Sequence, residues 1–195
     1  MGERAFIIHG YQGYPAEAWL PWIKAQLEER GYRVCLPAMP HPDRPVIREW
    51  IDFIANLVGK PDSRTVMIAH SIGCDAVLHY LEMLGGNSMS VGKTVLVAAR
   101  FPSGMSSAEA ERKIEGDEIL KPWLTARLDP KKVQSAAGKC TVILSDNDPY
   151  IPIDEAKAGI RENLIAEIIV EHGKGHFNED DNITALPSAL SAALF

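Results

Sequence analysis

A serine stands at the junction of two apolar segments of different period. Residues 65–70 form a strand-like run, and an apolar helical pattern starts directly after Ser71. A serine on a tight strand-to-helix turn exposes its hydroxyl, and the N–H of the next residue, Ile72, points at the developing oxyanion. Ala69 and Gly73 are small enough to let strand and helix approach closely. The pattern predicts a nucleophilic serine; a plain strand-to-helix turn that carries a serine is the alternative.

A serine hydroxyl is a weak nucleophile, and it needs a general base that is oriented by an acid. In an open parallel sheet, reacting groups gather outside the carboxyl ends of the strands. Six histidines compete for the role of base. Only His176 combines a glycine loop, residues 173–175, with a position after the last strand-like run, so it is the predicted base.

The acid has two candidates in residues 145–152, which follow the fifth strand-like run. We favour Asp148, because Pro149 biases it toward an extended conformation that projects a short side chain from the loop. Asp146 is the alternative, and it could instead form an Asx turn. The interval from Asp148 to His176 has room for the helix and strand of one crossover.

A second oxyanion donor is expected from the loop after the first strand-like run. The N–H of Tyr11 is the first choice and that of Gln12 is the alternative. Gly10 and Gly13 permit the sharp backbone that such a loop needs. A plain turn without this role is the competing interpretation.

Short apolar runs alternate with helical patterns along the chain. Most of the runs are continuously apolar, which is typical of strands covered on both faces of a parallel sheet. The predicted strands are residues 5–9, 33–37, 65–70, 93–99, 140–145 and 167–171. The predicted helices are residues 15–30, 45–58, 72–84, 154–164 and 182–194, the last starting late or kinking at Pro187. The alternation predicts one α/β domain over residues 1–195, with about six parallel strands and helices on both faces.

One connection, from residue 99 to residue 139, is long for a compact α/β domain. It holds weak helical patterns at residues 108–113 and 123–136. Long excursions of this kind usually cover or shape a site, so residues 100–138 are predicted to cover the active site. Trp123 in this segment is a candidate substrate-binding residue together with Gln12; a core position is the alternative for Trp123.

Composition excludes several classes of function. The formal charge of −6 and the lack of a basic cluster argue against nucleic acid or an anionic membrane as partner. No signal-peptide pattern is visible, and three cysteines without CxxC spacing predict free thiols in a reducing compartment, the cytoplasm. The acidic run 179–181 is expected to complement a helix N-terminus rather than to bind metal. We expect no metal site and no cofactor.

Several motifs together resemble the compact serine hydrolases related to retinoblastoma-binding protein 9 and the bacterial YdeN-type proteins. They are His9-Gly10-Tyr11-Gln12-Gly13, Ala69-His70-Ser71-Ile72-Gly73, Ser145-x-x-Asp148-Pro149-x-x-Pro152, Gly175-His176-Phe177 and Pro122-Trp123. The resemblance spans nearly the whole chain. It implies a minimal α/β-hydrolase fold that lacks the first two strands of the larger superfamily. It also implies Ser71 as nucleophile, His176 as base and Asp148 as acid, while Ala69 departs from the commoner glycine.

The function expected from the residues and the resemblance is that of a carboxylesterase-like serine hydrolase. It would cleave small-molecule esters through an acyl-enzyme on Ser71. Two alternatives stay open. One is a non-catalytic module on a hydrolase fold that binds a protein partner; the other is a thioesterase or an enzyme that acts on C–C bonds.

Overall fold

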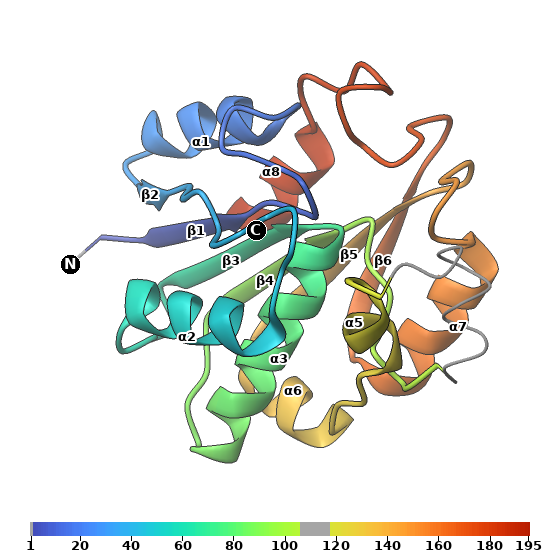
Figure 1. Ribbon diagram of the computed structural model, residues 1–195. Helices are drawn as coiled ribbons and strands as arrows, with labels where there is room; N and C mark the ends of the chain where they lie inside the picture. The colour runs from blue at the N-terminus through green and yellow to red at the C-terminus, as the bar shows by residue number, and fades with distance from the viewer. Residues whose placement is uncertain (1, 106–117) are drawn as a thin grey trace.

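The computed structural model describes residues 2–105 and 118–195 of the chain (Figure 1). Its centre is a six-stranded sheet in the order β2-β1-β3-β4-β5-β6, in which every neighbouring pair is parallel. The strands are β1 (Arg4–Ile8), β2 (Arg33–Cys35), β3 (Thr65–His70), β4 (Lys93–Val97), β5 (Lys139–Ser145) and β6 (Ala166–Glu171). The α/β-hydrolase fold expected from the sequence is confirmed.

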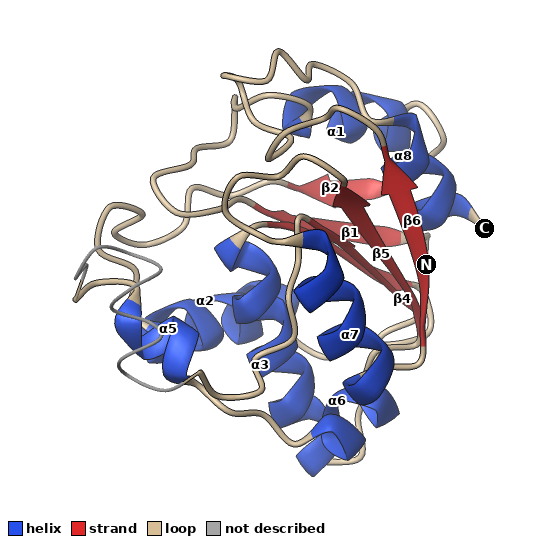
Figure 2. Cartoon of the chain, turned by 90° about the vertical axis from the view of Figure 1, so that its right-hand side faces the viewer, coloured by secondary structure: helices blue, strands red, loops and turns tan. Residues whose placement is uncertain are grey.

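Helices cover both faces of this sheet, as Figure 2 shows. On one face lie α1 (Leu20–Glu28) and α8 (Pro187–Leu194). The other face carries α2 (Ile47–Val58), α3 (Ile72–Gly86), α5 (Lys121–Thr125), α6 (Pro130–Ala136) and α7 (Ile153–Asn163).

The four inner strands, β1, β3, β4 and β5, are mostly apolar on both sides because they separate two hydrophobic cores. In β1, Ala5 and Ile7 join the core under α1 and α8, whereas Phe6 and Ile8 join the core under α2 and α3. Successive side chains of a strand point to opposite faces, so a strand buried on both faces cannot alternate apolar with polar residues. This explains why the continuous runs in the sequence predicted strands correctly.

The register brings the proposed site segments together. β1 and β3 pair from Arg4 with Thr65 to Ile8 with Ala69, so the loop after β1 starts beside the end of β3. β5 and β6 pair as far as Ser145 with Glu171, so the loops that follow them also start side by side. All of these loops leave the carboxyl edge of the sheet, where α/β proteins build their sites.

Helix bounds differ from the predicted ones where proline intervenes. α1 begins at Leu20 rather than at residue 15, with Pro21 in its first turn, where its missing N–H costs nothing. The predicted helix 123–136 is divided into α5 and α6. Pro130 opens α6, and the Asp129 side chain caps it by accepting from the N–H of Lys131 at 3.0 Å. The pattern at residues 108–113 lies outside the described residues.

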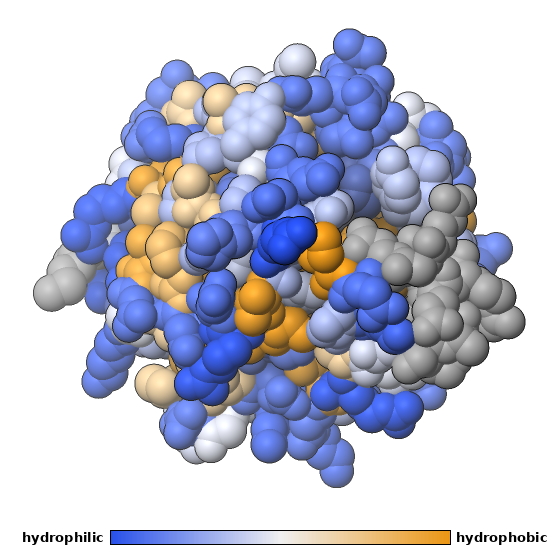
Figure 3. Space-filling model, in the orientation of Figure 1, coloured by the Kyte–Doolittle hydropathy of each residue, from blue (hydrophilic) through white to orange (hydrophobic). Residues whose placement is uncertain are grey.

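Polar side chains cover most of the face in Figure 3, and apolar ones gather between α2 and α5. A groove in this region is lined by Pro45, Val46, Ile47 and Pro122, among others. In the described part of the chain, no helix is both long and apolar enough to cross a bilayer. The three cysteines carry free thiols.

Candidate active site

Ser71 occupies the turn between β3 and α3 in a strained conformation. Its φ is 54° and its ψ is −127°, a region that non-glycine residues rarely adopt. Such strain costs on the order of 1–3 kcal/mol and persists only where the surroundings enforce it. The Ser71 N–H donates to the carbonyl of Val97 on β4 at 3.0 Å, which fixes the turn to the sheet. The hydroxyl is thereby presented at the carboxyl edge.

Gly73 allows the start of α3 to lie against the end of β1. A Cβ at this position would come within 2.5 Å of the carbonyl oxygen of His9 and within 2.7 Å of that of Ile8. Both oxygens belong to the backbone of a buried segment, so they cannot rotate away as a side chain would. The requirement for glycine here is therefore steric.

We expect Gly73→Ala to lower the free energy of unfolding by about 1–3 kcal/mol and to reduce hydrolytic activity, because the added methyl pushes α3 from β1. Urea unfolding and ester turnover measure the two effects. Gly159→Ala is the matched control. Gly159 lies in α7, and a Cβ added there would meet no atom within 4 Å, so alanine should stabilise the protein by about 0.5–1 kcal/mol. Equal effects at the two glycines would contradict the steric argument.

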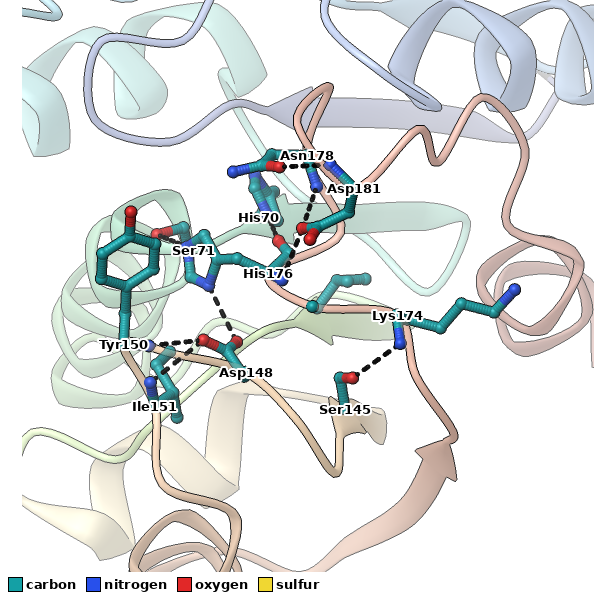
Figure 4. A network of polar contacts seen from close by, with 12 residues as sticks. His70, Ser71, Ser145, Asp148, Tyr150, Ile151, Lys174, His176, Asn178 and Asp181 are labelled. Atoms are coloured by element: carbon teal, nitrogen blue, oxygen red, sulfur yellow. Dashed lines mark hydrogen bonds and ion pairs between the residues drawn. The ribbon is translucent and has the colours of Figure 1, made fainter.

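His176 bridges Ser71 and Asp148 (Figure 4). Its Nε2 lies 2.8 Å from the Ser71 Oγ, and its Nδ1 lies 2.8 Å from Asp148 Oδ2. A carboxylate only accepts, so Nδ1–H donates to it and Nε2 accepts from the hydroxyl. The three residues follow β3, β5 and β6, and the structure brings together the three side chains that the sequence singled out.

Asp148 is held by its own loop. Its side chain is 2% exposed, and Oδ1 accepts from the N–H groups of Tyr150 at 2.9 Å and Ile151 at 3.1 Å. One oxygen is therefore committed to the loop, and the other faces His176.

Asp146, the alternative acid, faces a different histidine. Its Oδ2 lies 2.6 Å from Nδ1 of His172, and its Oδ1 accepts from the N–H of Gly173 at 2.8 Å. The bond from Gly173, followed by that with His172, lowers the pKa of Asp146. Asp146 thus connects the loops that follow β5 and β6 at an exposed position. Of the two aspartates, Asp148 is the one that contacts His176.

Two polar residues outside the predicted site hold the His176 loop. The Asn147 Oδ1 accepts from the N–H of Gly175 at 2.8 Å, and the Asp181 Oδ2 accepts from the N–H of His176 at 2.7 Å. The acidic run 179–181 was expected to complement a helix N-terminus. That expectation is wrong, because α8 begins only at Pro187. The Asp181 carboxylate instead caps the histidine loop.

His70 also holds the His176 loop. It is buried, and its Nε2 lies 2.7 Å from the carbonyl oxygen of His176, which can only accept. Burial, followed by the charge of the neighbouring His176, lowers the pKa of His70 to about 3. His70 is therefore neutral near pH 7, with its proton on Nε2, and it anchors the backbone of His176.

The depressed pKa of His70 makes stability depend on pH. As pH falls below the ordinary value of 6.5, the unfolded chain takes up a proton that folded His70 refuses until about pH 3. Stability is thus fully present above 6.5 and is lost on acidification, by up to about 1.4 kcal/mol per pH unit. We expect His70→Gln, whose amide can still donate to His176, to flatten this slope between about pH 6 and pH 4. Urea unfolding at several pH values tests this; parallel curves would contradict it.

His9 also has a structural role. The N–H of Met39 donates to its Nε2 at 2.9 Å, so Nδ1 carries the proton and donates to the carbonyl of Gly10 at 2.9 Å. Burial lowers the pKa of His9. Both ring nitrogens are occupied, and the ring fixes the loop that precedes α1.

This loop and α3 carry the predicted oxyanion donors. Ile72 is the first residue of α3, where N–H groups have no partner within the helix. Gln12 has a φ of 55° and donates its N–H to the carbonyl of Pro42 at 2.8 Å, so this N–H is already engaged. Tyr11, Gln12 and Ile72 all line the same cavity as Ser71.

The cavity beside Ser71 has a volume of about 670 Å³. Leu120 and Leu124 of the long connection form part of its wall. α6, which belongs to the same connection, packs along α3 instead. Tyr150 lies at the mouth of the cavity, 68% exposed, with its ring edge-on to His176 at 4.9 Å between centroids. These three residues could not be predicted from the sequence, because nothing local distinguishes them.

Trp123 does not line this cavity, so its predicted role in substrate binding is corrected. It is 1% exposed and donates from Nε1 to the carbonyl of Pro45 at 2.9 Å. Its ring packs edge-on against Trp50 at 5.6 Å in the core. A large aromatic ring gains most from full burial when its N–H finds a partner, as it does here.

Comparison with known proteins gives consistent matches. The family model described as "Serine hydrolase" matches residues 5–193. YdeN of Bacillus subtilis (strain 168) is 28% identical over 187 residues, covering 96% of this chain and 92% of that protein. Serine hydrolase RBBP9 of Rattus norvegicus is 24% identical, covering 98% and 97%.

Solved structures agree in fold. The crystal structure of the ydeN gene product from B. subtilis superposes with a TM-score of 0.83 at 27% identity, covering 97% of this chain and 95% of that one. A carboxylesterase structure from Nitrososphaera gargenis gives 0.63 at 18% identity, covering 90% and 84%.

Proposed function

The chain belongs to the serine hydrolase family, and we propose that it hydrolyses small carboxylic esters through an acyl-enzyme on Ser71. One observation carries the proposal. Hydrogen bonds of 2.8 Å on both sides of the imidazole connect the Ser71 hydroxyl through His176 to the buried carboxylate of Asp148. A hydroxyl with a base on one side and an oriented acid behind it is an activated nucleophile.

Acylation starts when Ser71 Oγ attacks the ester carbonyl and gives its proton to His176 Nε2. Asp148 holds the proton on Nδ1 and stabilises the imidazolium. Negative charge develops on the carbonyl oxygen, and the N–H groups of Ile72 and Tyr11 stabilise it. The tetrahedral intermediate then breaks its bond to the alkoxide oxygen, which takes the proton from Nε2 and leaves as the alcohol.

Deacylation repeats these steps with water as nucleophile. His176 takes a proton from the water, the hydroxide adds to the acyl carbon, and Ser71 leaves with the proton from Nε2. Two features support small esters as substrates: a cavity of about 670 Å³, within the range of small-molecule sites, and apolar walls at Leu120 and Leu124.

A fluorophosphonate probe and p-nitrophenyl acetate test the proposal. We expect the probe to modify the wild-type protein, with peptide mass spectrometry locating the phosphonate on Ser71. With p-nitrophenyl acetate we expect steady turnover near neutral pH. Absence of both labelling and turnover would instead favour a non-catalytic module that binds a protein partner. A label on another residue would refute the assignment of the nucleophile.

A further inference from the structure

A buried carboxylate with an unused oxygen lies in the same cavity as Ser71. Asp75 is on α3, one helical turn after Ser71, and its side chain is only 7% exposed. In the part of the chain that the structure describes, its Oδ1 is buried without a hydrogen-bond partner. Asp75 also lines the cavity, and because buried polar groups are nearly always paired, a polar group of a ligand is the partner that this carboxylate lacks within the protein.

The partner of Asp75 within the protein satisfies it incompletely. Arg100, in the loop after β4, donates from Nη2 to Asp75 Oδ2 at 3.3 Å and to the carbonyl of Trp123 at 2.7 Å. Charge-assisted bonds are usually about 2.7–2.9 Å long, so the contact with Asp75 is a weak one. Burial raises the pKa of Asp75 while Arg100 opposes this shift. Arg100 lines the cavity as well.

The charges of this pair restrict the chemistry of a ligand. An ammonium group that approaches Asp75 would lie beside the guanidinium, and a carboxylate that approaches Arg100 would lie beside Asp75. Either one would leave a buried charge uncompensated, which is costly. A neutral hydroxyl donates to the carboxylate and accepts from the guanidinium, and it fits Asp75 in either protonation state.

We propose that Asp75 and Arg100 form a specificity site that binds a neutral hydroxyl of the ester substrate. In such a substrate the hydroxyl is close to the scissile carbonyl, because Asp75 lies only one helical turn from Ser71. The hydrocarbon part of the substrate then lies against Leu120 and Leu124. This inference rests on the proposed function, since it names the substrate class of the same cavity.

Binding to the full-length Ser71→Ala variant tests the inference without turnover. NMR titration gives Kd values for four ethyl esters of similar size: ethyl butanoate, ethyl 3-hydroxybutanoate, ethyl 3-aminobutanoate and monoethyl succinate. We expect the hydroxy ester to bind about tenfold more tightly than ethyl butanoate, as one hydrogen bond to a charged group predicts. The ammonium and carboxylate esters should bind more weakly than the hydroxy ester.

Substitutions of Asp75 and Arg100 test whether this pair causes the preference for the hydroxy ester. Asp75→Leu combined with Arg100→Met replaces both charges by apolar groups and leaves neither charge unpaired. In this double variant the ratio of the Kd values of ethyl butanoate and the hydroxy ester should fall to about one. Asp52→Asn, on the exposed side of α2, should keep it.

Three results would overturn the inference: no preference for the hydroxy ester, tightest binding of a charged ester, or a preference that survives the double substitution. Failure of the wild type to hydrolyse any of the four esters would contradict the proposed function instead, because these Kd values do not depend on turnover.

Discussion

Replacing Ser71 with alanine is expected to lower kcat for p-nitrophenyl esters by a factor on the order of 10⁵ and to abolish fluorophosphonate labelling. The variant keeps His176, Asp148 and the oxyanion donors, so any residual rate reports binding and electrostatic stabilisation alone. Steady-state kinetics with p-nitrophenyl esters measures the loss of kcat, and titration with the fluorophosphonate probe measures the loss of labelling. Ser63→Ala, at an exposed position before β3, is the matched control and should label like the wild type. Persistent labelling of Ser71→Ala would contradict the assignment.

Ser71→Gly separates loss of the nucleophile from damage to the fold. Both substitutions remove the hydroxyl, but only glycine adopts a φ of 54° without strain. Ser71→Gly should therefore be as inactive as Ser71→Ala and more stable than it by about 1–2 kcal/mol. The difference in free energy of unfolding between the two variants measures the strain stored at the turn.

The sequence was sufficient to predict the sheet and the three central residues of the site, for physical reasons. Strands buried on both faces must be continuously apolar, so β3 and β5 were visible as runs. All strands of a parallel sheet end at the same edge, so polar residues directly after them converge. Ser71, Asp148 and His176 could therefore be grouped from the order of residues along the chain.

Residues that act through distant partners could not be predicted. His70 anchors the backbone of a residue that is 106 positions away in the chain. Asp75 and Arg100 meet across two strand ends, and no local pattern marks either one. Trp123 was assigned to a cavity wall, whereas tertiary packing places it in the core. Such contacts depend on the conformation of long loops, which local propensity does not determine.

Asp146 and Asp148 could not be distinguished firmly from the local sequence. Both carboxylates lie in one short loop after β5, and Pro149 gave only a conformational bias toward Asp148. The structure distinguishes them by their partners, since Asp148 contacts His176 while Asp146 contacts His172. The two aspartates therefore offer a matched pair of substitutions.

Asp148→Asn is expected to lower kcat by roughly three to four orders of magnitude with little change in fold. The N–H groups of Tyr150 and Ile151 require an oxygen at the Oδ1 position, so the new amide must turn its NH₂ toward His176. Nδ1 of His176 must then accept, which moves the ring proton to Nε2. That nitrogen can no longer take the proton of Ser71, although every distance is preserved.

Asp146→Asn is the control for this argument, because it makes the same chemical change in the same loop. Asp146 contacts His172 and Gly173 rather than His176, so wild-type-like kcat is expected. Titration of both variants with the fluorophosphonate probe should give slow labelling for Asp148→Asn only. Equal losses in the two variants would mean that loop geometry, rather than the tautomer of His176, limits the rate.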